Sequence, residues 1–292
     1  MLGAGPVALE MGQLFIRLGS AVTFITRGEV ASREELETSA TLCALLEEEG
    51  ARVVTHAAVN AIERAGAARR IAYHRDGKQE VVEVDEVLVA TGRRPNTAGL
   101  GLSEAGIEVN EHGAIKVGDD LQTTNPRGWA AGDVTAHAQF VYVAAYEGSI
   151  ASENALEGTG RKVDFHSLPR VIFTSPTFAA AGLTERQANA QGIDCECRVL
   201  PMTAVPRALV NRDTRGFVKI VAEAGSGWII GASMVAERAG DVIQAAVYAI
   251  QFGLTTAEVA ATWAPYLTFA EAFKLAAQTF TRDVSKLRCC AA

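Results

Sequence analysis

The pattern of apolar and polar positions predicts alternating helices and strands in the first third of the chain. Apolar residues at helical spacing predict that a glycine turn leads into a helix over 3–19, and a short apolar run predicts a strand over 21–25. A second helix is predicted over 34–49, followed by the next strand at Val53-Val54. This alternation is typical of an α/β fold with a parallel, doubly wound sheet.

The rest of the chain predicts a different organisation. Alternation over 70–84 around Asp76-Gly77 predicts an antiparallel hairpin, and an apolar run predicts a buried strand over 87–90. A helix is predicted over about 141–155, and a linker over 158–165. An α+β block with a mostly antiparallel sheet follows. Its strands are predicted near 171–173, 195–200, 217–222 and 228–235, and its helices near 184–191, 239–252 and 268–280.

Composition and charge narrow the class of protein. The 292 residues are 49% hydrophobic and 21% charged, which is an ordinary globular composition. A net charge of −7 without a basic run argues against nucleic acid or an anionic membrane as partner. No apolar stretch is long enough to cross a bilayer, and the first residues do not resemble a signal peptide. We therefore expect a cytoplasmic protein.

The segment Gly3-Ala4-Gly5-Pro6-Val7-Ala8 is a G-x-G-x-x-A turn at the start of a predicted helix. Gly3 permits a tight turn, Gly5 lets the backbone approach a pyrophosphate, and Ala8 lets the helix pack closely. The helix N-terminus attracts phosphate. We expect a dinucleotide site, although only Met1-Leu2 precede the turn, so that the first strand of the sheet is expected to be missing.

The end of the second predicted strand favours NADPH over NADH. NAD sites place an acidic residue there for the ribose 2′-hydroxyl, whereas arginine suits the 2′-phosphate. Here Arg27 ends the strand and Arg33 follows in the next turn, while Glu29 is the nearest carboxylate. The alternative is that both arginines are solvated surface residues.

Three ordered segments resemble the signatures of the pyridine nucleotide–disulfide reductase flavoenzymes: Gly3–Glu10, Val89–Arg93 and Ala130–Asp133. In that family the last segment belongs to the FAD domain. The resemblance implies that Asp133, together with Gly132 and Gly92, contacts FAD. It also implies that Glu10 lies near the flavin.

The resemblance implies three domains. A doubly wound NAD(P)H-binding domain, truncated at its N-terminus, would cover 1–90, and the C-terminal part of an FAD-binding domain would cover 91–160. An α+β dimerisation domain would cover 165–292 and form a homodimer. The predicted helix 268–280 supports this interface, because it carries apolar residues around more of its circumference than one domain face buries.

The segment from Tyr266 to Glu271 distinguishes members of the family. Several disulfide reductases carry His-Pro-Thr-x-x-Glu here, with the His–Glu pair as acid–base catalyst for a thiol. This chain has tyrosine in place of histidine, and a pKa of about 10 suits tyrosine poorly to that work. Mercuric reductases resemble this sequence: their tyrosine helps to bind the metal. The resemblance gives Tyr266 that role, and Glu271 corresponds to the acid of the family pair.

The adjacent thiols Cys289 and Cys290 suggest a metal clamp. Neighbouring Cα atoms lie about 3.8 Å apart, below the usual disulfide range of about 4.4–6.8 Å, so the pair is suited to stay reduced. Two reduced thiols are soft ligands for a soft cation such as Hg(II). The alternative is a cysteine-rich tail without function. For Cys195 and Cys197, on one predicted strand, packing is favoured over metal binding.

The resemblance implies an enzyme that reduces Hg(II) to Hg(0) with NADPH through FAD and a redox-active Cys-x4-Cys disulfide, for mercury resistance. The chain contains neither the N-terminal FAD fingerprint nor that cysteine pair, so we expect it to be inactive by itself. Two alternatives remain. One is another disulfide reductase of the thioredoxin or lipoamide type, and the other is a non-catalytic, dimerising, metal-binding remnant.

Overall fold

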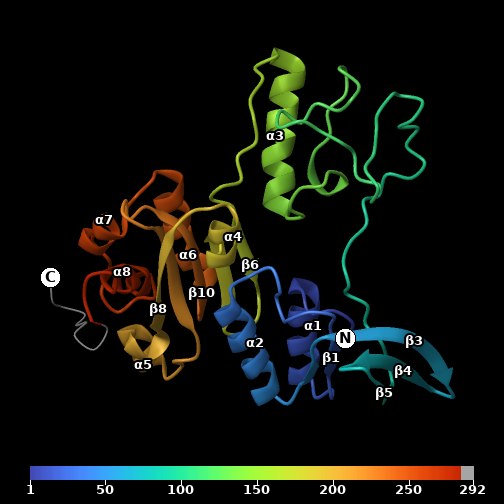
Figure 1. The fold of residues 1–292 in the computed structure, drawn as a ribbon, viewed down its shortest axis with the longest axis horizontal. Helices are drawn as coiled ribbons and strands as arrows, with labels where there is room; N and C mark the ends of the chain where they lie inside the picture. The colour runs from blue at the N-terminus through green and yellow to red at the C-terminus, as the bar shows by residue number, and fades with distance from the viewer. Residues whose placement is uncertain (284–292) are drawn as a thin grey trace. The chain divides into compact units, whose positions relative to one another are not determined.

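The computed structural model describes residues 1–283 (Figure 1). They form two compact units. The first contains Met1–Thr91 together with the chain from His166 onward, and the second contains Gly92–Phe165. In the described part of the chain, no helix is long and apolar enough to span a bilayer.

The doubly wound part begins with the glycine turn and α1 (Pro6–Arg17), followed by β1 (Thr23–Ile25), α2 (Leu36–Glu48) and β2 (Arg52–Val54). The strands β1 and β2 are parallel, as predicted. The end of the strand before the turn is present: Leu2 pairs in parallel with both Ile25 and Val89. Leu2 thus lies between β1 and the 87–90 segment and connects them.

The 87–90 segment is less buried than predicted. In the described chain its bridge partner is Leu2 alone, and the Val89 side chain is 65% exposed. The expectation of a buried strand is wrong for Val89. A short apolar run has the same pattern in a central strand and in one paired on a single side.

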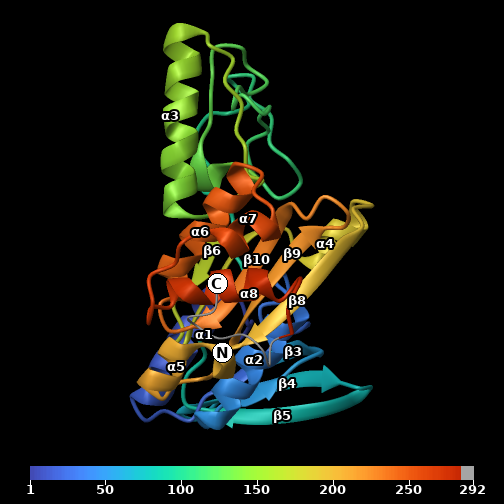
Figure 2. The same ribbon diagram turned by 90° about the vertical axis from the view of Figure 1, so that its left-hand side faces the viewer.

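A three-stranded antiparallel sheet follows, with the order β3 (Ala57–Ala65), β4 (Ala68–Arg75) and β5 (Lys78–Val84) (Figure 2). The predicted hairpin is confirmed, and its turn residues Asp76 and Gly77 both have positive φ. The sequence pattern did not predict β3, because most of its side chains are exposed and show no apolar alternation.

The second unit is built around α3 (Val141–Glu157), which ends at Gly158 in the left-handed conformation. Leu121 and Ile150 form its small buried core. The short 3-10 turn η1 (Gly132–Val134) precedes the helix. The predicted helix over about 141–155 is confirmed.

From residue 169 onward the chain forms a five-stranded antiparallel sheet with the order β6-β7-β10-β9-β8. The expected antiparallel sheet is confirmed, and β7 is a strand that the pattern did not predict. Its strands are β6 (Pro169–Ile172), β7 (Thr177–Gly182), β8 (Cys195–Pro201), β9 (Phe217–Glu223) and β10 (Ile229–Ala236). The helices are α4 (Glu185–Ala190), α5 (Pro206–Asn211), α6 (Ala239–Gln251), α7 (Thr256–Ala261) and α8 (Ala270–Gln278), with the 3-10 turn η2 (Met202–Ala204) after β8.

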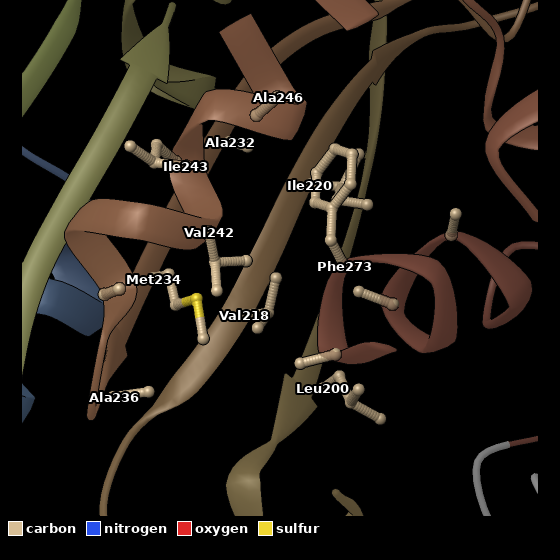
Figure 3. Close-up of a cluster of buried hydrophobic side chains, with 14 of the residues drawn as sticks. Leu200, Val218, Ile220, Ala232, Met234, Ala236, Val242, Ile243, Ala246 and Phe273 are labelled. Atoms are coloured by element: carbon tan, nitrogen blue, oxygen red, sulfur yellow. The ribbon is translucent and has the colours of Figure 1, made fainter. Parts of the chain in front are cut away.

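Two buried clusters involve this sheet. In the first, α6 and α8 cover one side: Val242 lies near Val218, Ile243 near Ala232, and Phe273 near Ile220 (Figure 3). The second cluster joins the sheet to the doubly wound part, because Leu9 and Phe24 share it with Phe178, Phe217 and Val235. Segments that the sequence assigns to different domains thus share a core within the first unit.

Candidate functional site

Gly3 has a position that only glycine can occupy. Its φ is +98°, and a Cβ placed on it would lie 2.4 Å from the carbonyl oxygen of Ala90. Its amide donates to the carbonyl of Ile25 at 2.9 Å. The strand end is therefore held between two neighbouring segments, and the turn leaves it in a fixed direction.

Gly5 faces open space at the N-terminus of α1. It is the N-cap of the helix, and no side chain caps the first-turn amides. A Cβ on Gly5 would have no atom within 4 Å. Uncapped amides and the positive end of the helix dipole suit a phosphate group that approaches the backbone there. The geometry fits the pyrophosphate of a dinucleotide.

The helix behind this turn packs closely, for two reasons. Ala8 is fully buried, as its small side chain predicted. Gly12, which the sequence reasoning did not single out, would place a Cβ 2.1 Å from the ring of Phe24. A glycine within a predicted helix, seven residues after Gly5, is the signal that could have identified it.

The loop between β1 and α2 carries both predicted arginines. Arg27 and Arg33 are exposed, and the structure gives neither side chain a hydrogen bond or ion pair with the described residues. The nearby carboxylate of Glu29 is engaged: its Oε1 lies 2.7 Å from Nε2 of His56. The available side chains at this edge are thus cationic, which fits a 2′-phosphate.

The second unit places Gly132 and Asp133 in the 3-10 turn before α3. Gly132 has φ +77°, and an added Cβ would lie 3.0 Å from the Cβ of Ala144. Its amide donates to Oε2 of Glu147 at 2.5 Å. The turn presents Asp133 with its side chain 51% exposed, 3.6 Å from the guanidinium of Arg93. Gly92, at the start of this unit, has φ +143°.

Glu147 is a residue that the sequence reasoning missed. It is completely buried, and its second oxygen lies 2.7 Å from Nδ1 of His137. A buried carboxylate that accepts from both Gly132 and His137 fixes the turn that carries Asp133. Nothing in the local pattern distinguishes this glutamate from Glu153 and Glu157 in the same helix, neither of which is buried.

Glu10 lies on α1 and accepts a hydrogen bond from the amide of Phe173 at 2.9 Å. This contact ties α1 to the chain just after β6. The role of Glu10 near the flavin stays a prediction.

Tyr266 and Glu271 lie on either side of a tight turn. The Tyr266 side chain is 60% exposed, whereas Glu271 is buried. The backbone of Leu267, which has φ +62°, is hydrogen-bonded to the Glu271 carboxylate. The other oxygen, Oε2, is buried without a hydrogen-bond partner in residues 1–283. Burial raises the pKa of Glu271 above its ordinary value of 4.5.

Glu271→Gln should therefore stabilise the chain at alkaline pH. A raised pKa means that the folded state holds the proton more tightly, so the stability it contributes is present below the ordinary pKa and is lost as pH rises through the raised value. We expect equal stability near pH 4 and an advantage of about 1 kcal/mol for the variant near pH 8, measured by urea unfolding.

Glu258→Gln is the matched control, because its pKa is shifted the other way. The backbone and hydroxyl of Thr255 lower the pKa of Glu258, so this substitution should destabilise the chain at alkaline pH and not at acid pH. Equal pH dependence of the two variants would contradict the interpretation of Glu271.

The structure tests the expectation for Cys197 but not the one for the C-terminal cysteine pair. Cys289 and Cys290 lie outside the described residues. Within the described residues, no group of three or more His, Cys, Asp and Glu side chains could hold a metal ion. Burial, and after it the charge of Glu185, raises the pKa of the Cys197 thiol. A thiol that resists deprotonation is a poor metal ligand, which favours packing for this residue.

Two family models match this chain, one over its first half and one over the antiparallel sheet and its helices. The family model described as pyridine nucleotide-disulphide oxidoreductase matches residues 1–148, and the model of that family's dimerisation domain matches 168–277. The chain belongs to the pyridine nucleotide-disulphide oxidoreductase family. The fold expected from the resemblance is confirmed.

Relatives within this family point to one subfamily. All of the chain aligns with the mercuric reductases of Streptomyces lividans, at 52% identity, and Bacillus cereus, at 48%. It spans 61% and 46% of their respective lengths. Among solved structures, it is similar to the HOCl-induced flavoprotein disulfide reductase RclA from Escherichia coli (30% identity, TM-score 0.86), covering 96% of this chain and 64% of that one. LpdA from Mycobacterium tuberculosis is also similar (28% identity, TM-score 0.86), covering 96% and 61%.

Proposed function

We propose that this chain is the C-terminal portion of a mercuric reductase, an enzyme that reduces Hg(II) to Hg(0) with NADPH and FAD for mercury detoxification in the cytoplasm. The observation that carries the proposal is the exposed Tyr266, in the place of the acid–base histidine of thiol-reducing members. Identity of 40–52% with seven mercuric reductases, over the whole of this chain, supports it.

The NADPH side of the proposal assigns a task to each residue. Gly3 directs the turn, Gly5 admits the pyrophosphate to the amides of α1, and Ala8 keeps the helix against the sheet. Arg27 and Arg33 bind the 2′-phosphate.

The flavin side rests on the turn of the second unit. Gly132 and Asp133 would contact FAD, with Gly92 at the start of the same unit, and Glu10 would lie near the flavin ring. The buried Glu147 holds the Gly132 amide and so orients Asp133. FAD, when bound, would relay two electrons from NADPH to a disulfide.

The metal side of the proposal uses three residues. Reduction of Hg(II) to Hg(0) takes two electrons, which one hydride from NADPH supplies as NADP⁺ and a proton are formed. Cys289 and Cys290 would accept Hg(II) by thiolate exchange, and Tyr266 would bind it near the site of reduction. Glu271 holds the backbone after Tyr266 and thereby fixes where the phenol is presented.

The dimerisation domain over 165–292 is proposed to form a homodimer. Helix 268–280 does not supply the exposed apolar surface expected of it, because α8 is buried around most of its surface within its own chain, with Phe273, Leu275 and Ala276 all in the core. Large exposed side chains elsewhere in the domain support the interface instead. Trp263 is 97% exposed and Phe252 is 72% exposed, and such apolar surface is usually covered in an assembly.

The test is NADPH oxidation by the full-length protein that contains this chain. Hg(II) should drive oxidation, and replacing Cys289 and Cys290 together by alanine should slow it about tenfold or more when excess thiol competes for the metal. Replacing Cys195 and Cys197 is the matched control and should change little. Turnover of a disulfide substrate without any response to Hg(II) would contradict the proposal and favour a thioredoxin- or lipoamide-type reductase.

A further inference from the structure

The loop that carries Arg27 and Arg33 is fastened to the rest of the first unit at several points. On the near side, the amide of Ala31 donates to the carbonyl of Ala4, inside the glycine turn, at 2.9 Å. Within residues 1–283, the side-chain hydrogen bonds and ion pairs that fasten residues 32–37 come from far along the chain, from β6, α4 and β9.

Two arginines hold the residues on either side of Arg33. Nη2 of Arg186 donates to the carbonyl oxygen of Ser32 at 2.9 Å. Arg170 donates two parallel hydrogen bonds to the carboxylate of Glu34, from Nε to Oε1 and from Nη2 to Oε2, each 3.0 Å long. This fork arrangement is geometrically restrictive. Arg33 itself remains exposed between its two anchored neighbours.

A buried lysine fixes the end of the same loop. Lys219 on β9, whose side chain is 2% exposed, lies 3.1 Å from Glu35, 2.9 Å from Glu37 and 2.7 Å from Glu185. The amide of Glu185 also donates to the other oxygen of Glu35 at 2.8 Å. Glu35 is the N-cap residue of α2, so these contacts set where the loop ends and the helix begins.

A surface loop without such anchors samples many positions, and an arginine on it would contact a phosphate only part of the time. Discrimination between a 2′-phosphate and a 2′-hydroxyl requires the guanidinium to be held in place by its surroundings. The doubly wound part supplies two contacts near the start of this loop, the backbone bond from Ala31 to Ala4 and the pair of Glu29 with His56. The remaining contacts come from the segment that the family comparison assigns to dimerisation, residues 168–277.

We propose that Arg170, Arg186 and Lys219 are positioning residues for cofactor selection, which hold the 32–37 loop so that Arg33 is presented to the 2′-phosphate of NADPH. This inference rests on the proposed function, in which Arg33 recognises that phosphate. The dimerisation domain then has a second task besides assembly, because it determines how strongly the neighbouring domain prefers NADPH.

The experiment measures binding to the full chain by calorimetry, with adenosine 2′,5′-bisphosphate and 5′-AMP as probes. The wild-type chain should bind the bisphosphate more tightly. Arg186→Ala should weaken bisphosphate binding about three- to tenfold, since affinity falls with the fraction of loops in the competent position. Binding of 5′-AMP should not change. Arg186→Lys, which can still donate to the Ser32 carbonyl, should restore most of the preference.

Arg198→Ala is the matched control. Arg198 is an arginine of β8 with 43% of its side chain exposed, and its acidic partner, Glu196, lies on the same strand. It should have wild-type affinity for both probes. Arg170→Gln removes the fork to Glu34 and should reproduce the effect of Arg186→Ala.

The outcomes separate this inference from the proposed function. If Arg33→Ala abolishes the preference for bisphosphate while Arg186→Ala and Arg170→Gln keep it, the positioning role is overturned and the NADPH assignment stands. If Arg186→Ala weakens both probes equally, the contact is only structural, and the positioning role is again overturned. If the wild-type chain binds the two probes equally, the NADPH assignment fails and this inference fails with it.

Discussion

Gly5→Ala should leave the stability of the chain unchanged and weaken its binding of NADPH about tenfold or more. Gly5 has φ −85°, which alanine adopts freely, and no protein atom lies within 4 Å of the Cβ position. The methyl group would occupy the space through which a pyrophosphate must approach the backbone. The measurement is calorimetric titration with NADPH, beside thermal unfolding of the same samples.

Gly3→Ala is the matched variant two residues away, and its effect should be on the fold. Its Cβ would lie 2.4 Å from the Ala90 oxygen, at a φ of +98° that disfavours any side chain. Overlap and backbone strain together should cost about 3 kcal/mol or more in the free energy of unfolding. If Gly5→Ala binds NADPH as tightly as the wild type, the turn does not bind the pyrophosphate. If Gly3→Ala has the same free energy of unfolding as the wild type, Gly3 does not pack closely against Ala90.

Lys219→Met should destabilise the chain by about 3–5 kcal/mol, because removal of one partner leaves buried charges uncompensated. Lys219 is the cation among three carboxylates within 3.1 Å, and the side chain of Glu35 is only 4% exposed. The measurement is the free energy of unfolding in urea. Lys116→Met is the control: Lys116 pairs with Glu108 at 2.8 Å, but both side chains are more than half exposed. Its loss should change the free energy of unfolding far less, because water screens this exposed pair.

The free energy of unfolding of Lys219→Met should also depend on pH differently from that of the wild type. In the wild type, hydrogen bonding to Lys219 lowers the pKa of Glu185 below 4.5, so this stability is present above that value and is lost as pH falls through the lowered pKa. Without the lysine, the three carboxylates repel one another and bind protons more readily. The variant should therefore become more stable as pH falls from about 8 to about 5, and the gap to the wild type should narrow. A constant gap would show that the cost is loss of packing and not charge.

Local patterns identified most of the elements but missed those without a distinctive pattern. Helices α1, α2 and α3 carry apolar spacing or a terminal glycine, and they were predicted within a few residues. The strand β7 was missed because its centre is Ala179-Ala180-Ala181, and alanine has little preference for strands. Its place between β6 and β10 is decided by pairing with both neighbours, which no local window contains.

Some residues of the candidate site could be predicted from the sequence, and others could not. The glycine turn, the arginines after β1 and the tyrosine at 266 are visible in the sequence, because each chemistry depends on residue types at short spacing. Glu147 was not found, because its importance comes from burial against Gly132 and His137. Cys289 and Cys290 lie outside the described residues, so their role as a mercury clamp stays a prediction.

The sequence by itself determined the family and most of the helices and strands, since these follow from short-range spacing, and it predicts which residues bind phosphate and mercury. Only the tertiary structure decided which distant segments share a core and a charge cluster. Lys219 and Glu35 are 184 positions apart, and Arg170 and Glu34 are 136 apart. Their pairing follows from the way the five-stranded sheet packs against the doubly wound part. Periodicity reports only which face of an element is buried, and not what buries it.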